Sequence, residues 1–236
     1  MKFKRLCAFL LLVFITCSSV FAENKFVKVA FIGNYQSGKT CIWKRLLDEG
    51  FSEYERRSDT LSCRTIVRST GDDVLCIDLW DTAGSDKYYY EVMDFIRDAN
   101  FVFIVHDLYE KLNGEVKVYL SRIYRDVRER MIPDGKIVLV GSKYDLRHRD
   151  IANVAEQAKL VEEVAGHIPC PFVLTSAKED DDPGMAKILE YIVEQCKEMK
   201  LPNHSSPLIN KKFNSDIPAP APNPKSSEGS GFCVIA

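Results

Sequence analysis

The stretch Lys28–Thr40, KVAFIGNYQSGKT, is the feature of this chain that most constrains its fold. The apolar run Val29–Ile32 has the length and composition of a strand buried in a parallel sheet. Gly33 then opens a loop that Gly38-Lys39-Thr40 closes, with the spacing G-x-x-x-x-G-K-T, and an amphipathic segment follows from Cys41 to Glu49. A glycine loop between a strand and a helix wraps its backbone N–H groups around a phosphate chain. The stretch therefore predicts a site for a nucleoside phosphate.

Two side chains of the loop have chemistry that suits this ligand. Lys39 supplies a positive charge for the β- and γ-phosphates, and the hydroxyl of Thr40 can ligate Mg²⁺. The residues predicted to hold the phosphates are Gly33, Asn34, Tyr35, Gln36, Ser37, Gly38, Lys39, Thr40 and Cys41.

Length and charge limit the remaining possibilities. A chain of 236 residues suits one domain of ordinary size with extensions. With 32 Lys and Arg against 34 Asp and Glu the formal net charge is −2, which argues against a general nucleic-acid binder. The eight cysteines include no C-x-x-C pair, so neither a zinc site nor a disulfide scaffold is expected. Most of them are predicted to be small apolar core residues.

The N-terminal segment 1–22 differs from the rest of the chain. Lys2, Lys4 and Arg5 precede an apolar run from Leu6 to Thr16, and small residues lead to Ala22. This order is that of a secretory signal peptide, although an uncleaved hydrophobic anchor has a similar pattern. The apolar run is shorter than the about 20 residues that a membrane-spanning helix prefers.

The C-terminal segment 201–236 is rich in Pro, Ser, Asn and Ala, a composition typical of a disordered linker. It ends in Cys233-Val234-Ile235-Ala236, a C-a-a-X box of the farnesyl type, so Cys233 is the predicted lipidation site. Because one prenyl chain anchors a protein only weakly, this anchor would need a second signal.

Between these ends, strand and helix signals alternate, which favours an α/β fold with a mostly parallel sheet and helices on both faces. Residues 62–69 and 74–80 are expected to form a β-hairpin, and residues 51–60 to form a loop. Further strands are expected at 101–105, 137–140 and 172–174. Helices are expected at 39–49, capped by Gly50, then at 115–131, at 151–165 and from Pro183.

In open sheets of this kind ligands bind beyond the carboxyl ends of the strands. Three segments follow predicted strands there: Asp81–Gly84, Ser142–Asp145 and Thr175–Lys178. Asp81 can hold the shell of a Mg²⁺ ion, and the Gly84 amide can contact a γ-phosphate. Asp145 can accept two N–H bonds from guanine, whereas adenine offers neither, so this carboxylate predicts guanine as the base.

With these motifs in this order, the chain resembles the Ras-like small GTPase superfamily from about Phe26 to Lys200. The segments IDLWDTAG and FIRDANFVFIVHDL are most similar to the Rab branch. The resemblance implies a P-loop NTPase fold with a mostly parallel six-stranded sheet, and a GTPase domain over residues 23–200.

The resemblance also implies a site for GTP or GDP with Mg²⁺. Phe51 would lie beside the guanine ring, and Thr60 would be the switch threonine that ligates Mg²⁺, with Ser58 as its rival. The implied metal ligands are Thr40, Thr60 and Asp81, and the implied catalytic residues are Lys39, Thr60, Gly84 and Ser85. The remaining implied contacts to the nucleotide come from Ser142, Lys143, Asp145, Ser176, Ala177 and Lys178.

The chain departs from the family pattern at positions that matter for hydrolysis. Ser85 stands where a glutamine normally orients the attacking water, and serine is too short for that contact. Tyr35 and Gln36 occupy loop positions that usually hold small residues, and Tyr35 would crowd a partner's arginine finger. These departures resemble the Rnd-type members and imply slow hydrolysis. Ser142 stands in place of the usual Asn, which implies weaker nucleotide binding.

The implied function is a GTP-binding switch in membrane trafficking or signalling with weak GTPase activity. Its partners would be effectors, an exchange factor and a GAP. A module that stays GTP-bound and recruits effectors without turnover is the alternative, and an ATP-binding P-loop protein is a further one. Prenylation indicates the cytosolic face of a membrane, whereas a signal peptide indicates secretion, with action inside a host cell as a third account.

Overall fold

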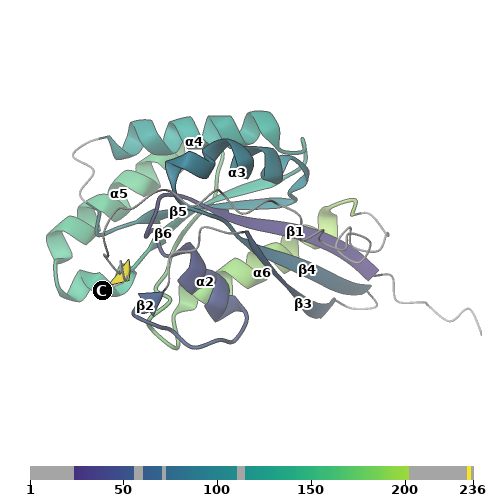
Figure 1. Ribbon diagram of the computed structural model, residues 1–236, viewed down its shortest axis with the longest axis horizontal. Helices are drawn as coiled ribbons and strands as arrows, with labels where there is room; N and C mark the ends of the chain where they lie inside the picture. The colour runs from purple at the N-terminus through teal and green to yellow at the C-terminus, as the bar shows by residue number, and fades with distance from the viewer. Residues whose placement is uncertain (1–23, 56–60, 71–72, 111–114, 202–232, 235–236) are drawn as a thin grey trace, which may run out of the picture.

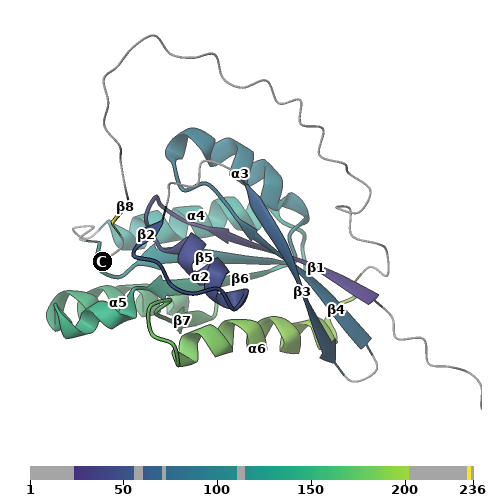
Figure 2. The same ribbon diagram turned by 60° about the horizontal axis from the view of Figure 1, so that its bottom comes forward.

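The computed structural model describes residues 24–55, 61–70, 73–110, 115–201 and 233–234. The predicted N-terminal segment 1–22 and nearly all of the predicted tail lie outside these residues. Figures 1 and 2 show one sheet with helices on both of its faces. This arrangement confirms the predicted α/β fold.

The sheet has six strands, of which only one runs antiparallel to its neighbour. β1 lies in the middle and pairs in parallel with both β4 and β5, while β3 pairs antiparallel with β4 as the predicted hairpin. In spatial order the strands are β3 (Ser62–Thr70), β4 (Asp73–Asp81), β1 (Asn24–Ile32), β5 (Phe101–Asp107), β6 (Lys136–Ser142) and β7 (Phe172–Leu174).

The helices form a layer on each face of the sheet (Figure 1). One face carries α3, α4 and α5, and the other carries α2 and α6. Their bounds are α2 (Lys39–Leu46), α3 (Tyr89–Phe95), α4 (Val116–Arg130), α5 (Ile151–His167) and α6 (Pro183–Glu198). Three short 3-10 segments, η1 (Asp86–Tyr88), η2 (Ile96–Asp98) and η3 (Tyr144–His148), lie in the connections.

Alternation along the central strands supplies both apolar layers. Ala30 and Ile32 of β1 face the layer under α3 and α4, whereas Val29 and Phe31 face the layer under α2 and α6. The Phe31 ring stacks on Phe103 of β5, with ring centroids 5.3 Å apart. Burial on both faces explains why the parallel strands read as continuous apolar runs in the sequence.

The start of α6 was predicted correctly. Pro183 is its first residue, and the Asp182 carboxylate accepts a hydrogen bond of 3.0 Å from the Met185 amide.

The predicted end of the first helix is wrong. The helix was expected to reach Glu49 with Gly50 as a left-handed cap, but α2 ends at Leu46. Asp48 adopts the left-handed conformation instead, with φ of 59°. Its amide donates to the Arg45 carbonyl at 3.1 Å, a short-range bond that tightens the last turn. Because Asp tolerates this conformation better than most residues, the turn closes before the glycine.

The predicted loop 51–60 contains a short strand that the sequence pattern did not indicate. β2 (Tyr54–Glu55) pairs antiparallel with β8 (Cys233–Val234), and residues 56–60 lie outside the described part of the chain. Within that part, Cys41, Cys170 and Cys196 are buried as expected, whereas Cys63 and Cys76 are only half-buried.

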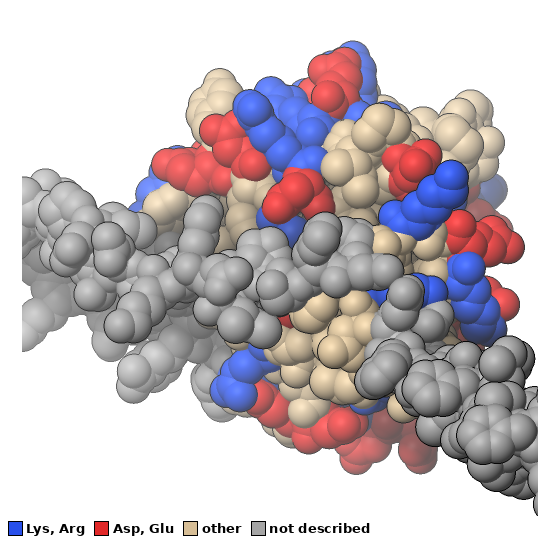
Figure 3. Space-filling model, turned by 90° about the vertical axis from the view of Figure 1, so that its right-hand side faces the viewer, with Lys and Arg blue, Asp and Glu red and all other residues tan. Residues whose placement is uncertain are grey.

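No helix within the described ranges is both long enough and apolar enough to cross a membrane. On the visible part of the face in Figure 3, Lys and Arg side chains are interspersed with Asp and Glu. This mixture agrees with the formal net charge of −2.

A buried histidine makes the stability of the fold depend on pH. His106 of β5 is 2% exposed, and burial holds its pKa below the usual value of 6.5, although the charge of Asp107 opposes the shift. The unfolded chain therefore binds a proton more readily than the folded one, so the free energy of unfolding should fall as the pH drops below about 6.5.

Urea unfolding between pH 7.5 and 5 measures this loss. In His106→Gln, the decrease in the free energy of unfolding that comes from protonation of His106 should be absent. An identical pH profile for both proteins would contradict the prediction.

Candidate functional site

Parallel strands bring the predicted site segments to one edge of the sheet. The loops after β1, β4, β6 and β7 all leave from the carboxyl ends of their strands, as the pairing of β1 with β4 and β5 and of β6 with β7 requires. Residues that are far apart in the sequence therefore meet around the start of α2.

The loop between β1 and α2 needs glycine at both of its ends. Gly33 has φ of 143° and Gly38 has φ of 90°, conformations that residues with a side chain rarely adopt. A Cβ atom on Gly33 would lie 2.1 Å from the Val105 carbonyl oxygen of β5. The spacing of the two glycines thus reflects backbone geometry as well as phosphate binding.

Lys39 lies at the centre of this loop and is 5% exposed. Its Nζ donates to the carbonyl oxygens of Asn34 at 2.7 Å and Gly33 at 3.1 Å. Burial lowers the pKa of the amine to about 8, while the charge of Asp81 opposes this shift. A cation held in this way is ready to exchange its carbonyl partners for phosphate oxygens.

Thr40 and Asp81 form a pair of oxygen donors beside the loop. The Thr40 hydroxyl donates to Asp81 Oδ2 at 2.8 Å, joining the start of α2 to the end of β4. A hydroxyl next to a carboxylate is the donor set that Mg²⁺ prefers, so these two residues fit the implied ion.

Gly84 approaches the loop so closely that no side chain fits. A Cβ atom there would lie 2.5 Å from Lys39 Nζ and 2.8 Å from the Tyr35 amide nitrogen. The segment Asp81–Gly84 is therefore in contact with the phosphate loop.

A pocket beside the loop is lined by most of the residues predicted to hold the base, together with Ile42 and two residues of the phosphate-binding stretch. Its lining comprises Gly38, Cys41, Ile42, Phe51, Ser142, Lys143, Asp145, Ala177 and Lys178. Asp145 accepts a 2.7 Å hydrogen bond from the Ser176 hydroxyl, which in turn accepts one of 3.1 Å from the Lys178 amide. These two bonds hold the Asp145 carboxylate at the pocket wall.

Ser142 is 2% exposed and connects β6 to the phosphate loop. Its hydroxyl lies 2.6 Å from the Ser37 carbonyl oxygen and 3.0 Å from that of His106. Because a hydroxyl has one proton, it can serve only one of these acceptors at a time, whereas an amide could serve both. A serine at this position therefore makes fewer simultaneous bonds to the loop than an asparagine could make.

Three contacts of the site were not predicted from the sequence. Lys143 forms an ion pair of 2.8 Å with Asp107, the last residue of β5. Lys178 forms one of 2.6 Å with Glu53, and its Nζ lies 5.9 Å from the centroid of the Phe51 ring. Asp107 could have been found from its place at the end of a strand, but nothing in the sequence pattern singled out Glu53.

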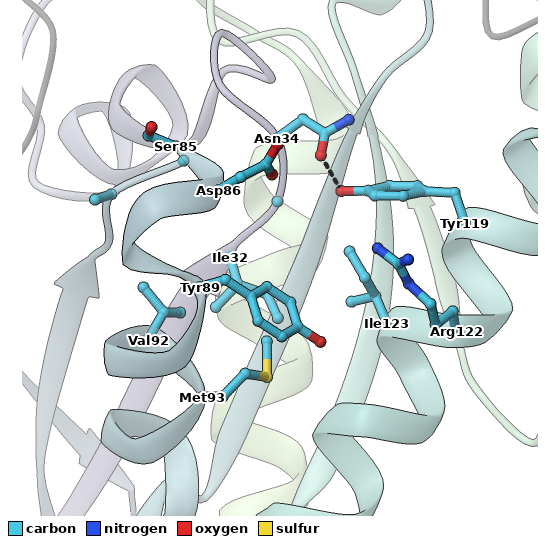
Figure 4. A pocket seen from close by; sticks show the side chains of 13 residues that line it. Ile32, Asn34, Ser85, Asp86, Tyr89, Val92, Met93, Tyr119, Arg122 and Ile123 are labelled. Atoms are coloured by element: carbon cyan, nitrogen blue, oxygen red, sulfur yellow. Dashed lines mark hydrogen bonds between the residues drawn. The ribbon is translucent and has the colours of Figure 1, made fainter.

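The third contact links the phosphate loop to α4. The Tyr119 hydroxyl donates to Asn34 Oδ1, as Figure 4 shows. Asn34 and Tyr119 line another pocket, and Ser85 lines it as well, beside Gly84 and Asp86. Thr60 and its rival Ser58 lie outside the described residues, so their role as the switch ligand stays a prediction.

The six-stranded sheet and the glycine loop between β1 and α2 define the fold of a P-loop protein. A family model described as "Ras family" matches residues 28–198, more than half of the chain. The protein therefore belongs to the Ras family.

Curated relatives agree with this assignment and include several Rab proteins. The chain is 28% identical to "Putative ras-related protein Rab-5B" of Dictyostelium discoideum over 182 residues, which are 75% of this chain and 78% of the relative. It is 24% identical to "Ras-related protein Rab-7B" of the same organism over 201 residues, 81% and 95% of the two chains.

Other relatives are matched over less of their length. The chain is 29% identical to the human "EF-hand calcium-binding domain-containing protein 4B" over 129 residues, which are 54% of this chain and 17% of that protein. It spans 65% of "Ras-related protein Rab-4" of Dictyostelium discoideum.

The pKa of Lys39 leads to a prediction about nucleotide binding. Phosphate groups beside the amine favour its charged form, so binding of a nucleoside diphosphate such as GDP near pH 8 should take up a proton. Above pH 8 the association constant should fall with increasing pH, by up to about tenfold per unit.

Calorimetry at pH 8 in two buffers of different ionisation enthalpy measures the protons taken up. Lys39→Arg keeps its charge at all these pH values, and any binding that it retains should show no uptake. Equal binding enthalpies in both buffers for the unmodified chain would contradict the prediction.

Proposed function

We propose that this protein is a guanine-nucleotide-dependent switch that hydrolyses GTP slowly. The observation that carries the proposal is the convergence of three parts on one edge of the sheet. These are the buried Lys39 inside its glycine loop, the pair Thr40 and Asp81, and the base pocket with Asp145. Membership in the Ras family supports the same reading.

The base pocket supports guanine as the base. Ser176 occupies Asp145 Oδ1, and the carboxylate retains acceptor capacity for the N1–H and 2-amino groups of guanine. Adenine presents no such pair of donors, so it would leave the carboxylate without partners at a cost in binding.

The switch would operate through the segments that adjoin the phosphates. Gly84 already lies against Lys39 and Tyr35, so an added γ-phosphate would meet its amide. GTP should then order residues 51–60 and 81–98, and loss of the γ-phosphate should release them. Effectors would bind the ordered form, and an exchange factor and a GAP would set its lifetime.

Hydrolysis breaks the bond between the γ-phosphorus and the β–γ bridging oxygen when water attacks, and the products are GDP and phosphate. A bound Mg²⁺ ion would neutralise charge on the β- and γ-phosphates. In this chain Lys39 and the loop amides remain to stabilise that charge, but Ser85 is too short to orient the water. We therefore expect slow turnover.

A module that stays GTP-bound is the second candidate. Tyr35 of the phosphate loop is 42% exposed, and a bulky side chain at this position would crowd a partner's arginine finger. A protein with this residue and Ser85 would recruit effectors until it is degraded or removed from the membrane.

The proposed location is the cytosolic face of a membrane. Prenylation of Cys233 or the apolar segment 1–22 would provide the anchor. Secretion through a cleaved signal peptide, with action inside a host cell, is the alternative, and N-terminal sequencing of the mature protein distinguishes the two.

Nucleotide content and single-turnover hydrolysis test the function and its rate. The purified full-length chain should contain a guanine nucleotide, and Ser85→Gln should hydrolyse GTP at least about tenfold faster because glutamine can orient the water. Ser121→Gln makes the same substitution on the exposed side of α4 and serves as the matched control.

If Ser85→Gln turns GTP over at the original rate, the short side chain is not what limits hydrolysis. If the purified chain already holds GDP and hydrolyses added GTP within minutes, the proposal of slow turnover is wrong.

Base specificity is tested by Asp145→Asn. The substitution replaces one acceptor by a donor, so affinity for GDP should fall at least about a hundredfold while xanthosine diphosphate gains affinity. Competition binding with GDP, xanthosine diphosphate and ADP measures the change. An unchanged preference among the three would favour an ATP-type P-loop protein.

A further inference from the structure

Two tyrosine hydroxyl groups connect α4 to the phosphate loop and to α3, which follows Ser85. Tyr119 donates to Asn34 Oδ1 in the phosphate loop, and Tyr89 of α3 donates to Asp126 Oδ2 of α4. Tyr119 and Asp126 are seven residues apart and therefore lie on the same side of the helix. Figure 4 shows Asn34, Tyr119 and Tyr89 around one pocket, which Ile32, Met93 and Ile123 also line.

The backbone of Asn34 lies where the phosphate loop meets the segment after β4. Its carbonyl oxygen accepts the 2.7 Å hydrogen bond from Lys39 Nζ. A Cβ atom on Gly84 would lie 2.7 Å from the same oxygen. A rotation of the Asn34 peptide would therefore change both the partner of Lys39 and the contact with Gly84.

The side chain of Asn34 has two polar neighbours. Its amide oxygen accepts from Tyr119, and the carboxyl group of Glu110, which follows β5, lies near its amide group. Burial, together with the charges of Glu110 and Asp86, raises the pKa of the Tyr119 hydroxyl far above its usual value. The hydroxyl thus stays protonated and remains a donor at physiological pH.

From these contacts we propose that Tyr119 is a positioning residue for nucleotide binding. Through Asn34 it fixes the phosphate loop in the shape that places the Lys39 amine and the Asn34 carbonyl next to Gly84. Tyr119 does not itself reach the phosphates. This inference rests on the proposed function, since it concerns the same nucleotide site.

Removal of the Tyr119 hydroxyl should leave the fold intact and loosen the loop. The Tyr119→Phe side chain keeps the ring that packs against the core, and only the donor to Asn34 is lost. Because one such hydrogen bond is worth a few-fold in an equilibrium or rate constant, GDP should dissociate about fivefold faster.

The dissociation rate of a fluorescent GDP analogue from the full-length chain tests the inference. Tyr124→Phe removes a hydroxyl from the same helix at a residue that packs against the same core, and it should dissociate within about twofold of the original rate. Asn34→Ala should accelerate release as Tyr119→Phe does, and the double variant should be no faster than Asn34→Ala alone.

The non-additivity separates positioning from a merely structural role. A structural role of the hydroxyl would accelerate release further in the Asn34→Ala background, and it would lower the melting temperature equally with and without Asn34. Additive effects, or an unchanged rate in Tyr119→Phe, would overturn the inference and leave the proposed function standing. Failure of the original chain to bind GDP would overturn both.

Discussion

The buried amine of Lys39 is the constraint on which the rest of the nucleotide edge depends. A cation with 5% exposure is costly unless oxygen atoms surround it. Here the loop supplies them as carbonyls, and it can turn them inward because Gly33 and Gly38 adopt positive φ angles. Burial still lowers the pKa of the amine to about 8, so an anionic ligand beside it would favour its charged form.

The second constraint is that the four loops after β1, β4, β6 and β7 must hold their positions around this amine. Parallel pairing brings them to one edge, but side-chain hydrogen bonds between the loops fix their spacing. Thr40 joins the phosphate loop to Asp81, and Ser142 joins β6 to Ser37. The first bond joins the phosphate loop to the end of β4, and the second joins it to β6, whose end lines the proposed base pocket.

The support of the loop from α4 adds a third connection. Tyr119 holds Asn34, and Asp126 of the same helix holds Tyr89 in the segment that follows Ser85. One rigid helix therefore contacts both the phosphate loop and the segment expected to respond to the γ-phosphate. In a protein with weakened hydrolysis, the lifetime of the bound state would depend on how firmly this helix holds the loop.

The sequence by itself determined the fold class and the glycine loop between β1 and α2, and it singled out the residues proposed to hold the base. These features depend on local patterns: an apolar strand, a glycine spacing, and polar residues directly after strands. The sequence-based prediction placed the end of α2 at Glu49 instead of Leu46. Asp48, and not Gly50, adopts the left-handed conformation there, because its amide forms a hydrogen bond to the Arg45 carbonyl in the folded helix. Tyr119 had no local signal either, since its role exists only where α4 packs beside β1 and the loop that follows it. Spacing along the chain encodes what a segment can bind, whereas contacts between distant segments, which only the tertiary structure forms, decide how firmly it is held.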